Sequence, residues 1–142
     1  MAHPADGGCI FCKIIAGSVP CFKLYEDEDT IAIMDINPAS EGHALAVAKG
    51  HWPTLLDVPP EIIGKVAATA QRVAQGVSKA MKPDGLNLIQ ANGKGAAQSV
   101  PHLHIHVLPR RIGDRLPINW DMTPGDMDRV KAVYQKVLAA ME

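Results

Sequence analysis

The chain has 142 residues, of which 47% are apolar and 20% charged, and its formal net charge is −1. This length suits one domain, and the composition excludes the disordered class. The near-zero charge gives no electrostatic support for nucleic acid or an anionic membrane as a partner. No apolar run approaches the roughly 20 residues that span a bilayer. The N-terminus also lacks the regions of a signal peptide, so we expect a cytoplasmic protein.

The chain is interpreted as a single domain, residues 1–142, that begins with a loose tail over residues 1–8. A short helical turn is predicted over residues 11–16. Residues with the alternation and composition of strands then occur in five segments. These segments are 22–26 and 30–35, which form a hairpin around an acidic turn, and 43–48, 86–90 and 102–108, the last of which ends at Pro109.

Apolar residues recur at helical spacing in two longer segments, 61–81 and 123–141. Two consecutive prolines fit the start of the first helix. Thr123 and Asp126 form a pair like a capping box at the start of the second. Hairpins, a helix and further strands predict an α+β fold with a mostly antiparallel sheet, and dimerisation is one way to cover a bare edge of so small a sheet.

The clearest chemical signal is the segment 101–108, in which His102, His104 and His106 alternate with apolar residues. Side chains on a strand alternate between its two faces, so the three imidazoles are predicted on one face and the apolar residues on the other. Three adjacent imidazoles are a poor choice for a packed sheet because each ring nitrogen needs a partner. Two chemistries fit: a metal site, or a neutral imidazole acting as a nucleophile.

The loop 91–100 precedes this strand and is rich in small residues, so its backbone can approach a ligand closely. Its N–H groups can form an anion-binding concavity. Asn92, Gln98 and Ser99 add neutral donors and acceptors. The loop is therefore interpreted as holding phosphate, although it matches neither the P-loop nor the dinucleotide fingerprint.

The motif His102-x-His104-x-His106, followed by two apolar residues, resembles the signature of the histidine triad (HIT) family. Gln98-Ser99-Val100 matches the block of its purine-nucleotide-binding branch. The resemblance runs back through Gly42-His43 and Asp35-Ile36-Asn37-Pro38 to Cys9. It implies a five-stranded antiparallel sheet with two main helices, and a homodimer in which two such sheets join.

The resemblance also implies that an AMP or GMP moiety is bound and that a nucleoside phosphoramidate, or a related conjugate, is cleaved at the α-phosphorus through a nucleotidyl-histidine intermediate. His104 would be the nucleophile, with one ring nitrogen held protonated by a backbone carbonyl. His106, Ser99 and Gln98 would be the other catalytic residues. The nucleotide-binding residues would be Asp35 on the ribose, Ile36 beside the base, and Asn92, Gln98, Ser99, Val100 and His106 near the phosphate.

Cys9-x-x-Cys12 has the spacing of half a zinc site. The resemblance to some bacterial members supplies His51 and His102 as the other half, so we expect a structural zinc on Cys9, Cys12, His51 and His102. Cys21 lies outside this pattern.

Three further features are given a structural role or are left open. His43 is interpreted as structural, at the start of its strand. Ala97 stands where the family often has glycine. Residues 112–142 form a C-terminal tail and helix, in which Trp120 could reach a neighbouring subunit or pack against its own domain.

Three alternatives to the phosphoramidate hydrolase remain open. One is a hydrolase of dinucleoside polyphosphates, for which Lys94 is the only obvious cation near the loop. Another is a nucleotide-binding scaffold without catalysis. In the third, the three histidines together hold a catalytic metal, although no suitably spaced acidic ligand accompanies them.

Overall fold

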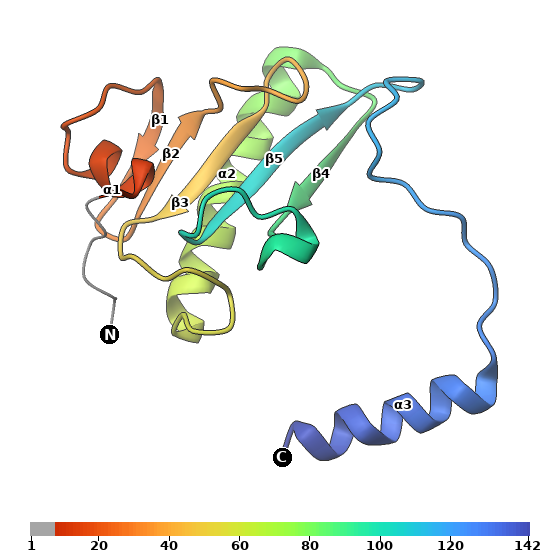
Figure 1. The fold of residues 1–142 in the computed structure, drawn as a ribbon. Helices are drawn as coiled ribbons and strands as arrows, with labels where there is room; N and C mark the ends of the chain where they lie inside the picture. The colour runs from red at the N-terminus through yellow and green to blue at the C-terminus, as the bar shows by residue number, and fades with distance from the viewer. Residues whose placement is uncertain (1–7) are drawn as a thin grey trace.

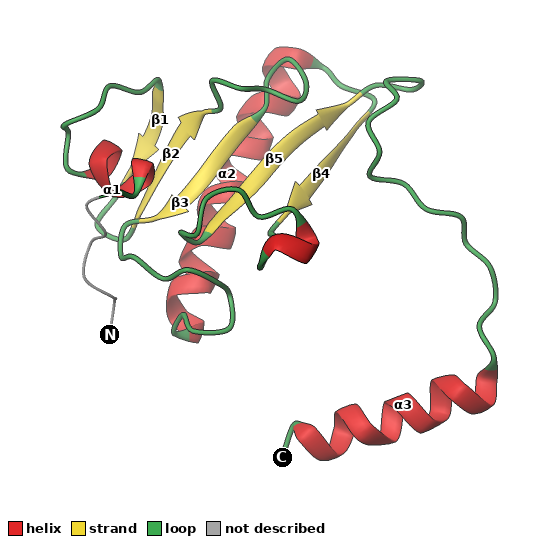
Figure 2. Ribbon diagram, in the orientation of Figure 1, coloured by secondary structure: helices red, strands yellow, loops and turns green. Residues whose placement is uncertain are grey.

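The computed structural model describes residues 8–142, so the predicted loose tail, apart from Gly8, lies outside the described residues. Five antiparallel strands form one sheet in the order β1-β2-β3-β5-β4, with the long helix α2 across one face (Figure 1, Figure 2). This confirms the predicted α+β fold. The elements are α1 (Ile10–Ile15), β1 (Lys23–Glu26), β2 (Thr30–Met34), β3 (Ala44–Ala48), α2 (Pro60–Met81), β4 (Gly85–Ile89), the 3₁₀ helix η1 (Lys94–Ala96), β5 (His104–Arg110) and α3 (Met127–Ala140).

The two faces of the sheet are packed differently. Small residues on the central strands, such as Ala44, Ala46 and Ala48, lie in the core cluster that includes Val66 and Val73 of α2. Alanines let the helix approach the sheet closely, and burial of the apolar face supplies most of the helix's stability. The opposite face carries larger side chains, namely Ile31, Ile33, Leu45 and Val47, which pack with Phe11 of α1. Strand β3 is therefore buried on both faces.

The register of β3 and β5 places two of the three signature histidines on the α1 face. Val47 pairs with His104, and Leu45 pairs with His106. Cross-strand partners share a face of the sheet. The alternation predicted for this strand is therefore present, with Ile105 directed toward the α2 side.

The predicted limits of this strand, residues 102–108, were wrong at both ends. It begins at His104 because His102 N–H donates to the Val100 carbonyl in a tight turn (2.8 Å). It continues through Pro109, which lies past the last residue of β5 that pairs with β3. On that side of the strand, the Pro109 carbonyl accepts a hydrogen bond from Ser40 Oγ (2.8 Å). The missing N–H of Pro109 therefore faces a side that has no strand, where it costs no ladder hydrogen bond.

The two long helices differ in how well their starts were predicted. Pro60 opens α2, one residue before the predicted start. α3 starts at Met127, four residues after its predicted start, and its cap is Asp126, which accepts from Asp128 N–H and Arg129 N–H. The predicted pairing with Thr123 was therefore wrong. Among residues 8–142, no helix combines the length and the apolar character needed to cross a bilayer.

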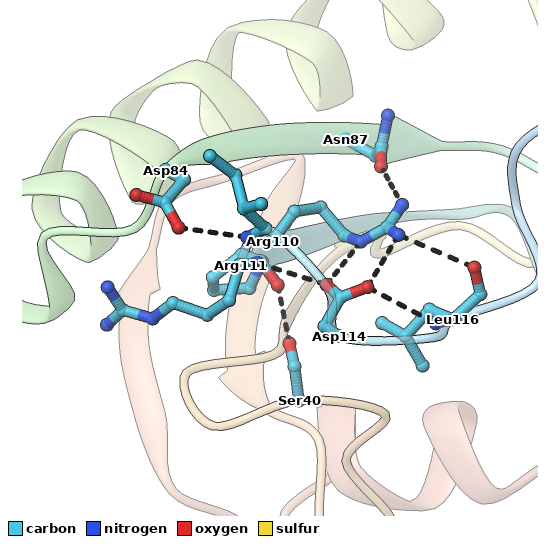
Figure 3. Close-up of polar contacts among 9 residues, drawn as sticks. Ser40, Asp84, Asn87, Arg110, Arg111, Asp114 and Leu116 are labelled. Atoms are coloured by element: carbon cyan, nitrogen blue, oxygen red, sulfur yellow. Dashed lines mark hydrogen bonds and ion pairs between the residues drawn. The ribbon is translucent and has the colours of Figure 1, made fainter.

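Beyond β5 the chain leaves the sheet at a cluster of hydrogen-bonded polar side chains around Arg110 (Figure 3). The Arg110 guanidinium donates two hydrogen bonds to the Asp114 carboxylate, at 2.7 and 2.8 Å, and a third to Asn87 Oδ1 of β4. This contact holds the pKa of Asp114 well below its usual range, chiefly through the hydrogen bond from Arg110. The Arg110 cluster therefore holds the chain at the point where the C-terminal arm, residues 112–142, begins.

The arm itself runs away from the sheet and ends in α3 (Figure 1). Trp120 is 80% exposed, so the alternative in which it packs against its own domain is wrong. The apolar stripe of α3 is exposed as well; it consists of Met127, Val130, Val133, Tyr134, Val137 and Leu138. Within one chain, the arm thus leaves a row of apolar side chains uncovered.

Gly42 precedes β3 with φ at +95°, a conformation that side chains rarely adopt. An added Cβ would also lie 2.9 Å from Met81 Cγ and 3.2 Å from Pro109 Cγ. We expect Gly42→Ala to lower the free energy of unfolding by about 1–3 kcal/mol in urea titrations. The control is Gly64→Ala, where the new Cβ meets nothing within 4 Å and helix propensity predicts a gain of about 0.5–1 kcal/mol. A Gly42→Ala chain as stable as the wild type would contradict this account.

Candidate functional site

A pocket of about 360 Å³ lies on the α1 face of the sheet, at the ends of β2 and β5. Most of its wall is apolar, with Ile10, Phe11 and Ile14 contributed by α1. Its polar side chains come from segments far apart in the sequence. They are Asp35, Asn37, His43, Ser99, His104 and His106.

His104 is buried at the base of this pocket with its proton fixed in place. Nδ1 lies 2.6 Å from the carbonyl oxygen of His102, and a carbonyl only accepts hydrogen bonds. Nδ1 therefore carries the proton of the neutral ring, and Nε2 carries the lone pair. Burial lowers the pKa of His104, so the neutral ring is favoured. This tautomer suits a nucleophile.

His43 was interpreted as structural, but it belongs to the pocket. Ala39 N–H donates to His43 Nδ1 (3.0 Å), which leaves the proton of the neutral ring on Nε2. That nitrogen lies 2.9 Å from His106 Nδ1 and 3.4 Å from Asp35 Oδ2. His43 therefore donates to His106 Nδ1, and the proton of His106 resides on its own Nε2. No local pattern around Gly42-His43 reveals this contact, because it joins residues 63 positions apart.

The two imidazoles of β5 thus differ in function although they stand two residues apart. Their rings lie edge to face with centroids 4.9 Å apart. His104 has an unprotonated Nε2, while His106 has an Nε2–H that can donate. A nucleophile and a hydrogen-bond donor beside each other are what attack on a phosphorus centre requires.

Asp35 and Ile36 lie at the mouth of the pocket. Asp35 Oδ1 accepts from Asn37 N–H (2.8 Å), a turn contact, while Oδ2 is directed toward His43. Ile36 is largely exposed. An exposed isoleucine beside a carboxylate offers an apolar surface and an acceptor to the same ligand.

The loop before β5 divides its predicted site residues into two groups. Ser99 and Val100 line the pocket. Gln98 instead closes the loop: its Oε1 accepts from Gly93 N–H (2.7 Å), and its Nε2 donates to the Pro53 carbonyl (2.6 Å). Asn92 is bonded to Gln90 and accepts from Leu55 N–H (2.7 Å). The structure therefore does not bring the Gln98 and Asn92 side chains to the pocket wall.

Ala97 adopts a left-handed conformation, with φ at +61°. Its N–H donates to the Lys94 carbonyl and closes the turn of η1. Glycine adopts such a backbone without a steric cost. This accounts for the glycine that the resemblance places at this position.

The four predicted metal ligands form a second cluster, with their donor atoms within 4.8 Å of one another. His102 Nδ1 lies 3.3 Å from Cys9 Sγ, 3.6 Å from Cys12 Sγ and 3.1 Å from His51 Nδ1, and Cys12 Sγ lies 3.2 Å from His51 Nδ1. Tetrahedral zinc, with arms of about 2.3 Å to sulfur and 2.0–2.1 Å to nitrogen, separates two nitrogens by about 3.3 Å, a nitrogen and a sulfur by about 3.6 Å, and two sulfurs by about 3.8 Å. The donor set fits zinc in number, chemistry and spacing.

The orientation of His102 supports the same conclusion. Its Nε2 lies 2.6 Å from the Ala48 carbonyl and therefore carries the proton. Nδ1 is left with the lone pair that a metal needs, and such a second hydrogen bond is the usual orienting contact of a metal-bound histidine. The alternative in which all three signature histidines hold one metal is wrong. Within residues 8–142, the side chains close enough to share a metal ion form two separate groups. His102 belongs to the group with the cysteines, His106 belongs to the group with Asp35 and His43, and His104 belongs to neither.

The fold and these two clusters define a histidine triad protein. A family model described as the HIT domain matches residues 16–113. The chain is 41% identical to adenosine 5'-monophosphoramidase HNT1 of Saccharomyces cerevisiae in an alignment that covers all of this chain and 89% of the yeast protein. The protein belongs to the HIT family.

Solved structures share the fold. A Streptococcus mutans protein superposes with a TM-score of 0.91 at 35% identity, covering 97% of this chain and 88% of that one. A structure described as a zinc-bound histidine triad protein of Mycobacterium smegmatis superposes at 0.73 with 38% identity, covering 95% of this chain and 98% of that one.

The buried histidines predict a loss of stability in mild acid. Burial is the largest of the effects that lower the pKa of His106 to about 4. The neighbouring His104 and His43 also lower this pKa, whereas Asp35 raises it. The unfolded chain takes up this proton near pH 6.5, whereas the folded chain takes it up only near pH 4. We therefore expect the free energy of unfolding to fall between pH 6.5 and 4, by on the order of 1–3 kcal/mol for this one group.

Thermal unfolding measured at a series of pH values checks this, with His106→Gln as the control. The variant has no titrating group at this position, so its stability should fall less steeply over the same range. Equal slopes for the wild type and the variant would contradict the assignment.

Proposed function

We propose that this protein is a hydrolase or transferase that cleaves nucleoside phosphoramidates, or related conjugates of AMP or GMP, at the α-phosphorus. The observation that carries the proposal is the fixed tautomer of His104, whose Nδ1–H is held by the His102 carbonyl. The yeast relative, which is named adenosine 5'-monophosphoramidase, supports the substrate class.

In the proposed reaction, Nε2 of His104 attacks the phosphorus in line with the leaving amine. The P–Nε2 bond forms and the bond to the amine breaks, which gives a nucleotidyl-histidine. The departing amine takes a proton from His106 Nε2–H or the Ser99 hydroxyl, both of which belong to the pocket wall. Water then attacks the phosphorus as the P–Nε2 bond breaks and returns a proton to the group that protonated the amine. This releases the nucleoside monophosphate and restores neutral His104.

The other pocket residues bind the nucleotide in this proposal. Asp35 accepts from the ribose hydroxyls, Ile36 covers the base, and Val100 with Ser99 lies against the phosphate. Gln98 and Asn92 contribute through the loop that they hold closed, rather than through phosphate contacts of their own side chains.

The pocket favours conjugates of one phosphate over dinucleoside polyphosphates. A longer phosphate chain needs cationic groups, and the described pocket wall contains neither lysine nor arginine. Lys94 is exposed in η1 and is not among the lining residues. A scaffold without catalysis has no need of the paired imidazole tautomers, so we favour the enzyme.

We propose that the Cys9, Cys12, His51 and His102 cluster holds a structural zinc. The donor spacing and the His102 tautomer support this, as does the zinc-bound relative. Bound zinc would supply folding energy by joining α1 to the sheet. The expected cytoplasmic location would keep the cysteines reduced for this purpose, and it remains a prediction.

We also propose a homodimer that pairs two β4 strands into one continuous sheet. The outer edge of β1 is protected by a bulge between Lys23 and Tyr25 and by the ion pair of Lys23 with Glu26 (2.7 Å). The edge strand β4, with the sequence Gly-Leu-Asn-Leu-Ile, has no charge, and Leu88 is 51% exposed. Unprotected apolar edges of this kind are sites of strand pairing.

The role of His104 can be tested by brief mixing with an adenosine phosphoramidate, acid quenching and mass spectrometry. We expect an adenylyl adduct on His104 in the wild type. We expect no adduct in His104→Ala and a fall in kcat/KM of about 10³-fold or more, because the variant lacks the nucleophile.

His3→Ala is the matched control, since it removes a histidine that has no role in the proposed reaction. It should retain the adduct and turn over the substrate like the wild type. Rapid turnover by His104→Ala would exclude a nucleophilic His104, and a wild type with neither adduct nor turnover would contradict the substrate class.

The proposed interface can be tested by sedimentation velocity. The wild type should sediment as twice the chain mass of 15.2 kDa, and Leu88→Glu should sediment as a monomer because it places charge in the apolar edge. Leu24→Glu is the control: Leu24 has a similar exposure of 48% but lies on β1. A Leu88→Glu dimer, or a monomeric Leu24→Glu chain, would contradict pairing through β4.

A further inference from the structure

His102 connects the cysteine cluster to the proposed nucleophile, and three of its atoms make polar contacts. Nδ1 faces Cys9 Sγ (3.3 Å) and His51 Nδ1 (3.1 Å), and Nε2–H donates to the Ala48 carbonyl (2.6 Å). Its carbonyl oxygen accepts from His104 Nδ1–H (2.6 Å). The side chain is fully buried, so it has no freedom to turn without disturbing these contacts.

Helix α1 makes a second connection between the same two clusters. Cys9 caps this helix, and Cys12 lies within it. Phe11, between them, is buried, and its ring packs edge to face with the rings of His104 (centroids 5.0 Å apart) and His102 (5.7 Å). Ile10 of the same helix lines the pocket. Two metal donors and one wall of the pocket therefore belong to one short helix.

This helix cannot be stable by itself. It has six residues, and isolated helices shorter than about 12–15 residues are marginal in water. Its backbone hydrogen bonds include both cysteines of the cluster: Lys13 N–H donates to the Cys9 carbonyl, and Ala16 N–H donates to the Cys12 carbonyl. Whatever holds the two thiol-bearing residues in place holds α1 in place.

We propose that the cysteine–histidine cluster positions the active site, with His102 as the positioning residue: divalent metal on the cluster fixes both the carbonyl that orients His104 and the α1 wall that contains Phe11. The inference rests on the proposed zinc site and on the proposed role of His104, and goes beyond both. Metal removal is then expected to loosen one wall of the nucleotide pocket while the sheet and α2 stay folded.

The first test is hydrogen exchange of the full chain, loaded with zinc and after removal of zinc by a chelator. We expect the amides of α1, reported by Lys13 and Ala16, to exchange about tenfold faster or more without metal, while those of α2 are unchanged. AMP affinity, measured by calorimetry, should fall about tenfold or more over the same step, which is the lower end of the loss of activity that follows removal of an orienting contact around a metal site.

Two variants separate positioning from general stability. Cys12→Ser removes one donor from the half-buried side of the cluster and should reproduce the metal-free exchange and AMP affinity even with zinc added. Val66→Ala truncates the core under α2, away from the cluster. It should lower overall stability but keep zinc, the protection of α1 and AMP affinity.

The outcomes distinguish this inference from the proposed function. Zinc removal that leaves α1 exchange and AMP affinity unchanged would overturn the inference, and so would a chain that takes up no zinc. A zinc-loaded chain that forms no nucleotidyl adduct would count against the proposed function alone, because α1 exchange still reports whether metal orders the pocket wall.

Discussion

The hydrogen bond from His104 to the carbonyl of His102 is the contact on which the chemistry of this protein depends. In a neutral imidazole, the partner of one nitrogen decides what the other can do. Here a backbone carbonyl holds the proton of His104, while His43 places the proton of His106 at the opposite end of its ring. Backbone and buried partners thus turn two identical side chains on one strand into an acceptor and a donor.

The sheet provides the rigidity that this arrangement requires. β5 lies between β3 and β4, and β3 is buried on both faces, so the strand that carries His104 cannot shift its register without exposing core residues. Ala44 and Ala46 allow α2 to pack closely on one side, which leaves the other side for Leu45 and the histidines. Packing on the far face of the sheet is therefore part of what places the site.

The sequence alone predicted the elements that depend on local pattern. The two-residue period placed His104 and His106 together, and the spacing of Cys9 and Cys12 indicated half of a metal cluster. His43 was misread because its partner is distant in the chain. The start of β5 was misplaced because a turn contact of His102 with Val100 replaces the ladder there. A distant side-chain partner decided the first of these details and a local backbone turn decided the second, and no periodicity encodes either.

One physical cause, burial in a largely apolar pocket, links the reactivity of the site to its substrate class. Burial disfavours the charged imidazole, and so keeps a lone pair available on His104 at neutral pH. A lysine or arginine in the wall would lower the histidine pKa values further and would hold a released nucleotide more tightly. A pocket whose described wall relies on neutral imidazoles and a hydroxyl instead offers hydrogen bonds to one phosphate without a fixed positive charge, which suits a reaction at a single phosphorus followed by release.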